Sequence, residues 1–231
     1  MKGVILDVYA RRVFAFVFLA AVNMVLVSSL QMYFYVYFMD FSAGQKSFVH
    51  GATMVGCGVG GLLSARLTQR FEKKGAVVLG GVISILANAV LALVFLTGLM
   101  PVDSHLSVGV FVIFHALYWL GSGVMLPTAT AMMADISELN KIRTGVLKDG
   151  AYSALFSFIL KAAISFSMLV SGYILSGIGF ESDRAGELSA EVIWRLGAVM
   201  LLVGPLVCLA AIIVMRKYRV SHALIDEMRD K

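Results

Sequence analysis

Residues 153–172 read SALFSFILKAAISFSMLVSG, and this stretch decides the class of the protein. Its only charge is Lys161, and about 20 predominantly apolar residues are enough for a helix to cross the hydrocarbon core of a bilayer. The whole chain has the same character, because 60% of its 231 residues are hydrophobic and 14% are charged. Soluble domains contain about 45–50% apolar residues. The composition therefore indicates a membrane protein.

Long runs without Asp, Glu, Lys or Arg divide the chain into segments that can each cross a membrane. Five runs carry no charge, and a sixth is interrupted only by Lys161. Lipid permits only helices or closed barrels, and the runs lack the alternation of barrel strands. We therefore predict an all-α membrane protein whose single domain, residues 1–231, contains six transmembrane helices. The expected spans are approximately 13–39, 47–67, 75–100, 107–134, 150–180 and 193–215, followed by a cytoplasmic tail at 216–231.

Lys and Arg residues are distributed unequally between the two sides of this topology. With six helices both termini share a side, which carries 15 Lys and Arg residues against three on the other. Because positively charged loops stay in the cytoplasm, we expect a multi-pass protein of the cell membrane with both termini cytoplasmic. The net charge of +5 is then an orientation signal, and we expect no nucleic-acid partner.

Two features imitate sites of soluble proteins. GCGVGG at residues 56–61 has the spacing of a dinucleotide-binding loop, but it lies within one apolar span and follows no predicted strand. We expect Gly56 and Gly60 to form a small face for close helix packing instead. Cys57 and Cys208 also lie inside spans, where they offer neither a disulfide framework nor metal-ligand spacing.

The sequence favours transport over catalysis. The spans contain no His-Glu-x-x-His motif, no paired carboxylates and no Ser/His/Asp set, so we predict no enzyme, metal or cofactor. No Asp or Glu lies within any of the runs, and a cation site needs such an acid or several converging oxygens. This chain alone is therefore poorly equipped to couple transport to a cation.

Lys161 belongs to a narrow polar stripe. Residues Ser153, Ser157, Lys161 and Ser165 recur every four positions, which places them on one helix face. Lys161 stands 11 residues after Gly150, near the middle of the membrane at about 1.5 Å per residue. A lysine there costs about 2.5–3.5 kcal/mol on insertion scales and usually faces a bundle interior or a wet cavity. We predict a role in a substrate or ion pathway, and a structural salt bridge is the alternative.

Two other spans contribute candidates for the same pathway. Asn23 and Gln31 are eight residues apart and share a helix face, although interhelical hydrogen bonding would also explain them. His115 and Trp119 are one turn apart and precede Pro127, which kinks or softens a helix. We expect these four residues to line a cavity or to take part in gating.

The segment at 127–180 resembles the glycoside-pentoside-hexuronide:cation symporters, the group of the major facilitator superfamily that includes melibiose permease. The matching positions are Ala134-Asp135, Glu138, Thr144-Gly145, Asp149-Gly150, Lys161, Gly172, Leu175 and Gly179-Phe180. YARRVFAFVFLA at 9–20 and YRVSHALIDEM at 218–228 also look like that family. The resemblance covers nearly the whole chain, but it corresponds only to the C-terminal six-helix half of a twelve-helix transporter.

The resemblance implies an alternating-access carrier in which two six-helix bundles rock about a central sugar site. It implies that Lys161 faces the sugar and a coupling cation, sodium or a proton, with Ser157 beside the sugar. The implied cytoplasmic gate comprises Asp135, Glu138, Thr144, Lys148 and Asp149. Leu147 and Leu139 depart from the family pattern, so the charges of this gate are expected to differ.

Three hypotheses follow for the complete protein, each with a lipid bilayer as its surroundings. The first is a half of a sugar:cation symporter that works with an N-terminal six-helix half and takes a small sugar or glycoside. A second is an autonomous protein that pairs with another copy as a carrier or channel. The third is an inactive transporter remnant.

Overall fold

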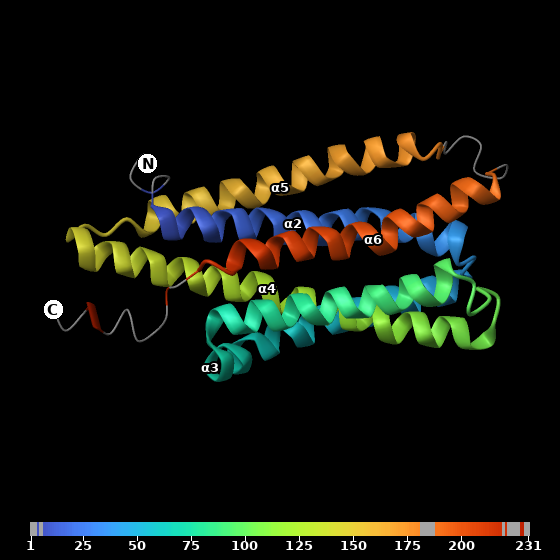
Figure 1. Ribbon diagram of the computed structural model, residues 1–231, viewed down its shortest axis with the longest axis horizontal. Helices are drawn as coiled ribbons and strands as arrows, with labels where there is room; N and C mark the ends of the chain where they lie inside the picture. The colour runs from blue at the N-terminus through green and yellow to red at the C-terminus, as the bar shows by residue number, and fades with distance from the viewer. Residues whose placement is uncertain (1–3, 5–6, 181–187, 219, 221–226, 229–231) are drawn as a thin grey trace.

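The computed structural model describes the chain apart from residues 1–3, 5–6, 181–187, 219, 221–226 and 229–231. The described residues form long helices joined by short connections (Figure 1). In chain order these are α2 (Val8–Tyr33), the π-helical turn η1 (Phe34–Phe38), α3 (Ala43–Leu96), α4 (His105–Thr144), α5 (Asp149–Gly177) and α6 (Ala190–Met215). The prediction of an all-helical membrane protein is confirmed.

The helix count differs from the prediction. Five helices in the described part of the chain are long and apolar enough to cross a membrane, and not six. The span expected at 47–67 and most of the span expected at 75–100 lie in α3, a single element of 54 residues that ends at Leu96. Its backbone leaves the helical region at Glu72, where φ is 58° and ψ is 169°. Such a conformation is strained for a residue with a side chain.

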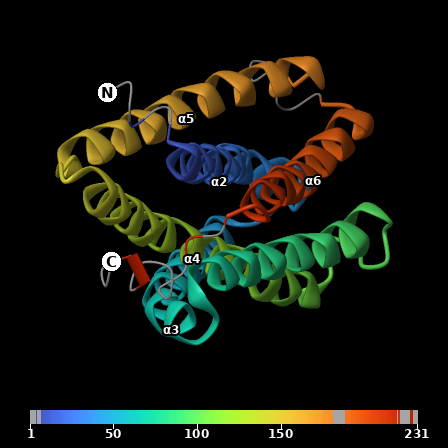
Figure 2. The ribbon, with the colours of Figure 1, turned by 60° about the vertical axis from the view of Figure 1, so that its left-hand side comes forward.

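The two parts of α3 on either side of Glu72 run in opposite directions along α4. In the first part, Gly56 meets Ala116 and Gly60 meets Leu120, so residue numbers rise together. In the second part they run against each other, because Gly80 meets Gly121 and Ser84 donates to the Tyr118 carbonyl oxygen. Figure 2 shows α3 turning back on itself beneath α4.

Glycines set the distance between α3 and α4. A Cβ at Gly56 would lie 2.5 Å from the Ala116 carbonyl oxygen, and one at Gly60 would collide with the Leu120 carbonyl oxygen. A Cβ at Gly80 would lie 2.6 Å from the Gly121 carbonyl oxygen. The predicted packing role of Gly56 and Gly60 is confirmed, and it operates within this chain.

Several helix ends are joined at one end of the molecule, where α2 begins, α6 ends and α3 bends (Figure 1). Asp7 caps α2 by accepting from the Tyr9 and Ala10 backbone amides, and it also accepts from the Tyr152 hydroxyl at 3.2 Å. Lys74, beside the bend, donates to the Arg216 carbonyl oxygen at 2.8 Å. These bonds hold α2 to α5 and the bend of α3 to the end of α6.

The glycine contacts predict a sharp difference between two neighbouring substitutions. Gly60→Ala should lower stability by about 1–3 kcal/mol, because its methyl group forces α3 away from α4. Thermal unfolding in detergent, followed by the reaction of the buried Cys208 with a maleimide dye, measures the effect. Gly58→Ala is the matched control, since nothing lies within 4 Å of a Cβ at Gly58. Equal midpoints for the two variants would contradict this account of the packing.

Candidate substrate pathway and gate

Helix α5 is the least covered of the membrane-length helices. Only 11% of its most apolar window is buried, against 61% for the span that contains α2. Its buried side is small. There, Ala163 packs in a cluster with Ala21 and Leu26 of α2. Figure 2 shows α5 along the outer edge of the bundle, with α2 beside it. Much of α5 therefore has no neighbour among the residues that the structure describes.

The polar stripe lies on the uncovered side of α5. Its four members are all exposed, namely Ser153, Ser157, Lys161 and Ser165. Lys161 forms no hydrogen bond or ion pair within the described residues. A salt bridge to Lys161 would therefore need an acid from outside the part of the chain that the structure describes.

The other pathway candidates lie inside the bundle, away from the uncovered face of α5. The Tyr118 hydroxyl donates to Asn23 Oδ1 at 3.0 Å, and both side chains are fully buried. Gln31 Oε1 lies 3.3 Å from His115 Nε2. The structure thus shows hydrogen bonds between α2 and α4 for both Asn23 and Gln31. Contact of these residues with a substrate stays a prediction.

A cavity of about 540 Å³ lies between α4 and α5 at the end that holds the expected gate. Its lining brings Glu138 and Asp149 together with Ser153 and Ser157, the two stripe residues that precede Lys161. Asp149 also accepts a hydrogen bond from Ser137. The acids of the expected gate therefore adjoin one end of the polar stripe.

The remaining gate candidates end α4 or precede α5. The Thr144 hydroxyl donates to the Asn140 carbonyl oxygen at 2.8 Å, within the last turn of α4. Lys148 immediately precedes α5, and its carbonyl oxygen accepts from the Ala151 amide at 2.9 Å. Both residues thus shape the connection between the two helices that enclose the cavity.

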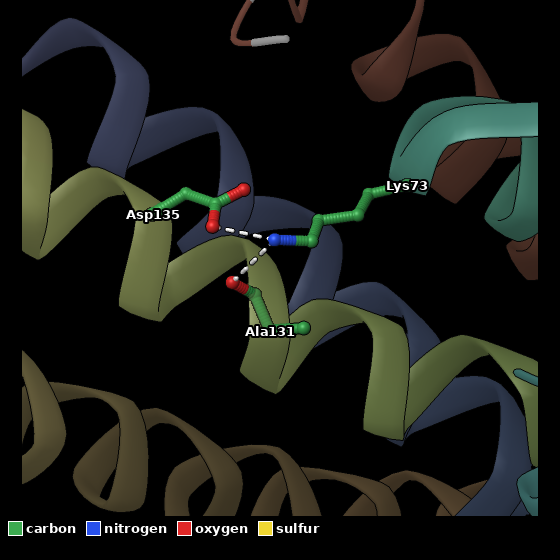
Figure 3. A network of polar contacts seen from close by, with 3 residues as sticks. All are labelled: Lys73, Ala131 and Asp135. Atoms are coloured by element: carbon green, nitrogen blue, oxygen red, sulfur yellow. Dashed lines mark hydrogen bonds and ion pairs between the residues drawn. The ribbon is translucent and has the colours of Figure 1, made fainter. Parts of the chain in front are cut away.

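Asp135 is held by a lysine of the same bundle. Lys73 Nζ lies 2.5 Å from Asp135 Oδ1 and 3.4 Å from the Ala131 carbonyl oxygen (Figure 3). Both charged side chains are 14% exposed. Burial and the charge of Asp135 also raise the pKa of Tyr218, which follows α6. Because Lys73 comes directly after Glu72, the ion pair fastens the bend of α3 to α4.

Sequence reasoning missed three members of these networks. Lys73 was counted only among the 15 Lys and Arg residues of the expected cytoplasmic side, and His50 was not considered, although its Nδ1 lies 3.5 Å from Gln31 Nε2. Tyr118 is fully buried and bonds Asn23. One usable signal was the spacing of Tyr118 from His115, since residues three apart share a helix face.

The ion pair at the bend should respond differently to single and double substitution. Asp135→Asn should lower stability by about 1–3 kcal/mol, because Lys73 keeps its charge in a largely buried place without an ionised partner. Replacing both residues, as K73M/D135L, should recover most of the loss, since the pair then becomes apolar. Thermal unfolding of the two variants in detergent measures the difference. A double variant that is less stable than Asp135→Asn would contradict this prediction.

Comparison with known proteins identifies a family. A search of curated proteins found no match. A sequence model of the family described as MFS/sugar transport protein, where MFS is the major facilitator superfamily, matches residues 1–222. The five membrane-length helices agree with a multi-pass protein of this kind. The chain belongs to the MFS/sugar transport family, whose members are transporters rather than enzymes.

Proposed function

We propose that the chain is the C-terminal six-helix half of a sugar:cation symporter of the melibiose permease-like group. It works by alternating access together with an N-terminal six-helix half. The observation that carries the proposal is the exposed polar stripe on α5, with Lys161 near mid-span. Membership of the sugar transport family supports the class of substrate.

The position of Lys161 favours a second bundle over lipid as its neighbour. A charge near the middle of a membrane is costly where it meets hydrocarbon, and such residues normally face a bundle interior or a water-filled cavity. The described residues provide neither a cover nor an ionic partner for Lys161. A facing bundle would enclose the stripe and leave its ammonium and hydroxyl groups to hydrogen-bond a sugar.

The membrane topology that we propose has six crossings and cytoplasmic termini. The opposite directions of the two parts of α3 support two crossings within that element. Three features lie at one end of the molecule, namely the α3 bend, the end of α4 and the end of α6 (Figure 1). Their common position supports a single cytoplasmic side. On this side Asp135, Glu138, Thr144, Lys148 and Asp149 would contribute to the gate.

The coupling cation, sodium or a proton, is assigned to the complete transporter. Its carboxylate ligands would come from the N-terminal half, because the spans of this chain contain no Asp or Glu. The melibiose permease-like grouping rests on the residues of 127–180 that match that pattern, Lys161 among them.

Radiolabelled sugar uptake tests the proposal. Cells that make this chain together with an N-terminal half should accumulate sugar, whereas cells with either half alone should not. Lys161→Ala should reduce uptake by the pair to background, because the substrate loses a charged partner in the pathway. Lys46→Ala removes a lysine outside the stripe and should leave uptake unchanged.

Two outcomes would contradict the proposal. Uptake by this chain alone, abolished by Lys161→Ala, would indicate a pair of identical copies. Full uptake by a pair that carries Lys161→Ala would exclude the stripe from the pathway.

A further inference from the structure

A chain of polar side chains crosses the bundle from α3 through α2 to α4. The half-buried His50 of α3 has its Nδ1 atom 3.5 Å from Gln31 Nε2 of α2. Gln31 Oε1 lies 3.3 Å from Nε2 of the fully buried His115 of α4. The Trp119 indole nitrogen lies 3.3 Å from that same His115 Nε2 atom.

The hydrogen bonds of this chain cannot all form at once. Gln31 Oε1 accepts only, so His115 Nε2 must carry a proton to bond it. The indole nitrogen of Trp119 donates only, so it needs His115 Nε2 without a proton. His115 Nδ1 is buried and has no hydrogen-bond partner among the described residues. The network therefore has two competing arrangements, which differ in the ring nitrogen of His115 that holds the proton.

The orientation of Gln31 selects between these arrangements. When His50 Nδ1 carries no proton, the Gln31 amide nitrogen donates a hydrogen bond to its lone pair. The Gln31 oxygen then points toward His115, which donates to it from Nε2. When His50 carries a proton at Nδ1, that proton needs an acceptor, so the Gln31 oxygen must turn toward His50. The Gln31 amide group then faces His115 Nε2, which must be a lone pair.

We propose that His50 is a proton-binding site and that Gln31 transmits its protonation to His115 and Trp119. His50 gains one proton from water at Nδ1. His115 stays neutral, because it loses its Nε2 proton to water and takes one up at Nδ1. The His115 Nε2 lone pair then becomes available to Trp119. The site goes beyond the proposed sugar transport and does not depend on it.

Few charges surround this site. The sequences of α2, of α4 up to Ala134 and of α3 up to Phe71 contain no Asp or Glu. Gln31 of α2 contacts His50, and Gln31 in turn contacts His115 of α4 and the hydroxyl of Tyr35 of η1. On the α3 side, Lys46 lies one turn earlier, and Asp40 is the acid that precedes the helix. A proton on His50 is thus answered by a neutral amide. Its turning breaks the 3.4 Å hydrogen bond that the Tyr35 hydroxyl donates to Gln31 Oε1, and the Tyr35 oxygen can then accept from the Gln31 amide nitrogen instead.

The full chain in detergent micelles can report both ends of this relay. Nitrogen NMR of wild-type protein labelled in the histidine rings should show His115 change from the Nε2–H to the Nδ1–H form between about pH 8 and about pH 5, the range in which histidine titrates. In a Trp194→Phe background, fluorescence of the remaining Trp119 should change over the same range. His50→Gln should abolish that change.

Two further variants separate the relay from a general effect of acid. In Gln31→Leu, the NMR signals of the His50 ring should still change with pH while the Trp119 fluorescence becomes independent of pH. The control H105Q/H222N removes the other two histidines and should preserve the fluorescence change. The proposal is overturned if His115 keeps one tautomer throughout in the wild-type protein, or if folded His50→Gln retains the change. The NMR measurement decides the question even if the variants do not fold.

Discussion

Backbone contact between α3 and α4 is the constraint on which the rest of the bundle depends. Gly56, Gly60 and Gly80 let the two parts of α3 approach α4 to distances that a side chain would forbid. Ser84 adds a hydrogen bond to the Tyr118 carbonyl oxygen at 2.8 Å. Helices in lipid associate through van der Waals packing and hydrogen bonds, because lipid provides no hydrophobic driving force between them. The contact between α3 and α4 therefore orients α4, so that Tyr118 faces α2 and α6. Helix α5 is left outside that arrangement.

Because α5 lies at the edge of the bundle, its polar residues on the buried side and those on the uncovered side have different hydrogen-bonding needs. On the buried side, the Ser167 and Ser171 hydroxyls donate to carbonyl oxygens of their own helix, at 2.7 Å and 2.8 Å. Such serines need no other partner in a low-dielectric environment. An ammonium group has three donors and a full charge, so Lys161 cannot be satisfied in this way. The uncovered face therefore needs polar surroundings that the buried face does not.

The sequence predicted those features that depend on lipid and missed those that depend on neighbouring helices. Charge-free runs revealed the membrane-length segments because lipid excludes charges. The reversal expected between the spans at 47–67 and 75–100 occurs at the single residue Glu72, inside one helical element. The sequence did not indicate that residue, because no Gly- or Pro-rich loop marks the turn. Four-residue spacing grouped Lys161 with its serines, but helical periodicity does not say which neighbour a face meets. Gln31 and His115 were therefore not placed together before the structure joined them.

Neutral polar groups can be inserted into the membrane without the desolvation cost of an ionised carboxylate. A buried acid in the span must be paired or pay a large desolvation cost when it ionises. His50, Gln31 and His115 can enter the membrane uncharged and contact one another through polar atoms across three helices. On the proposed assignment, the spans then acquire a buried or half-buried charge, in addition to the exposed Lys161, only when a proton arrives at the half-buried His50, near the start of α3. A search of the sequence for intramembrane acids overlooks such a site, because the proton binds to a histidine, His50, and the amide of Gln31 transmits the change.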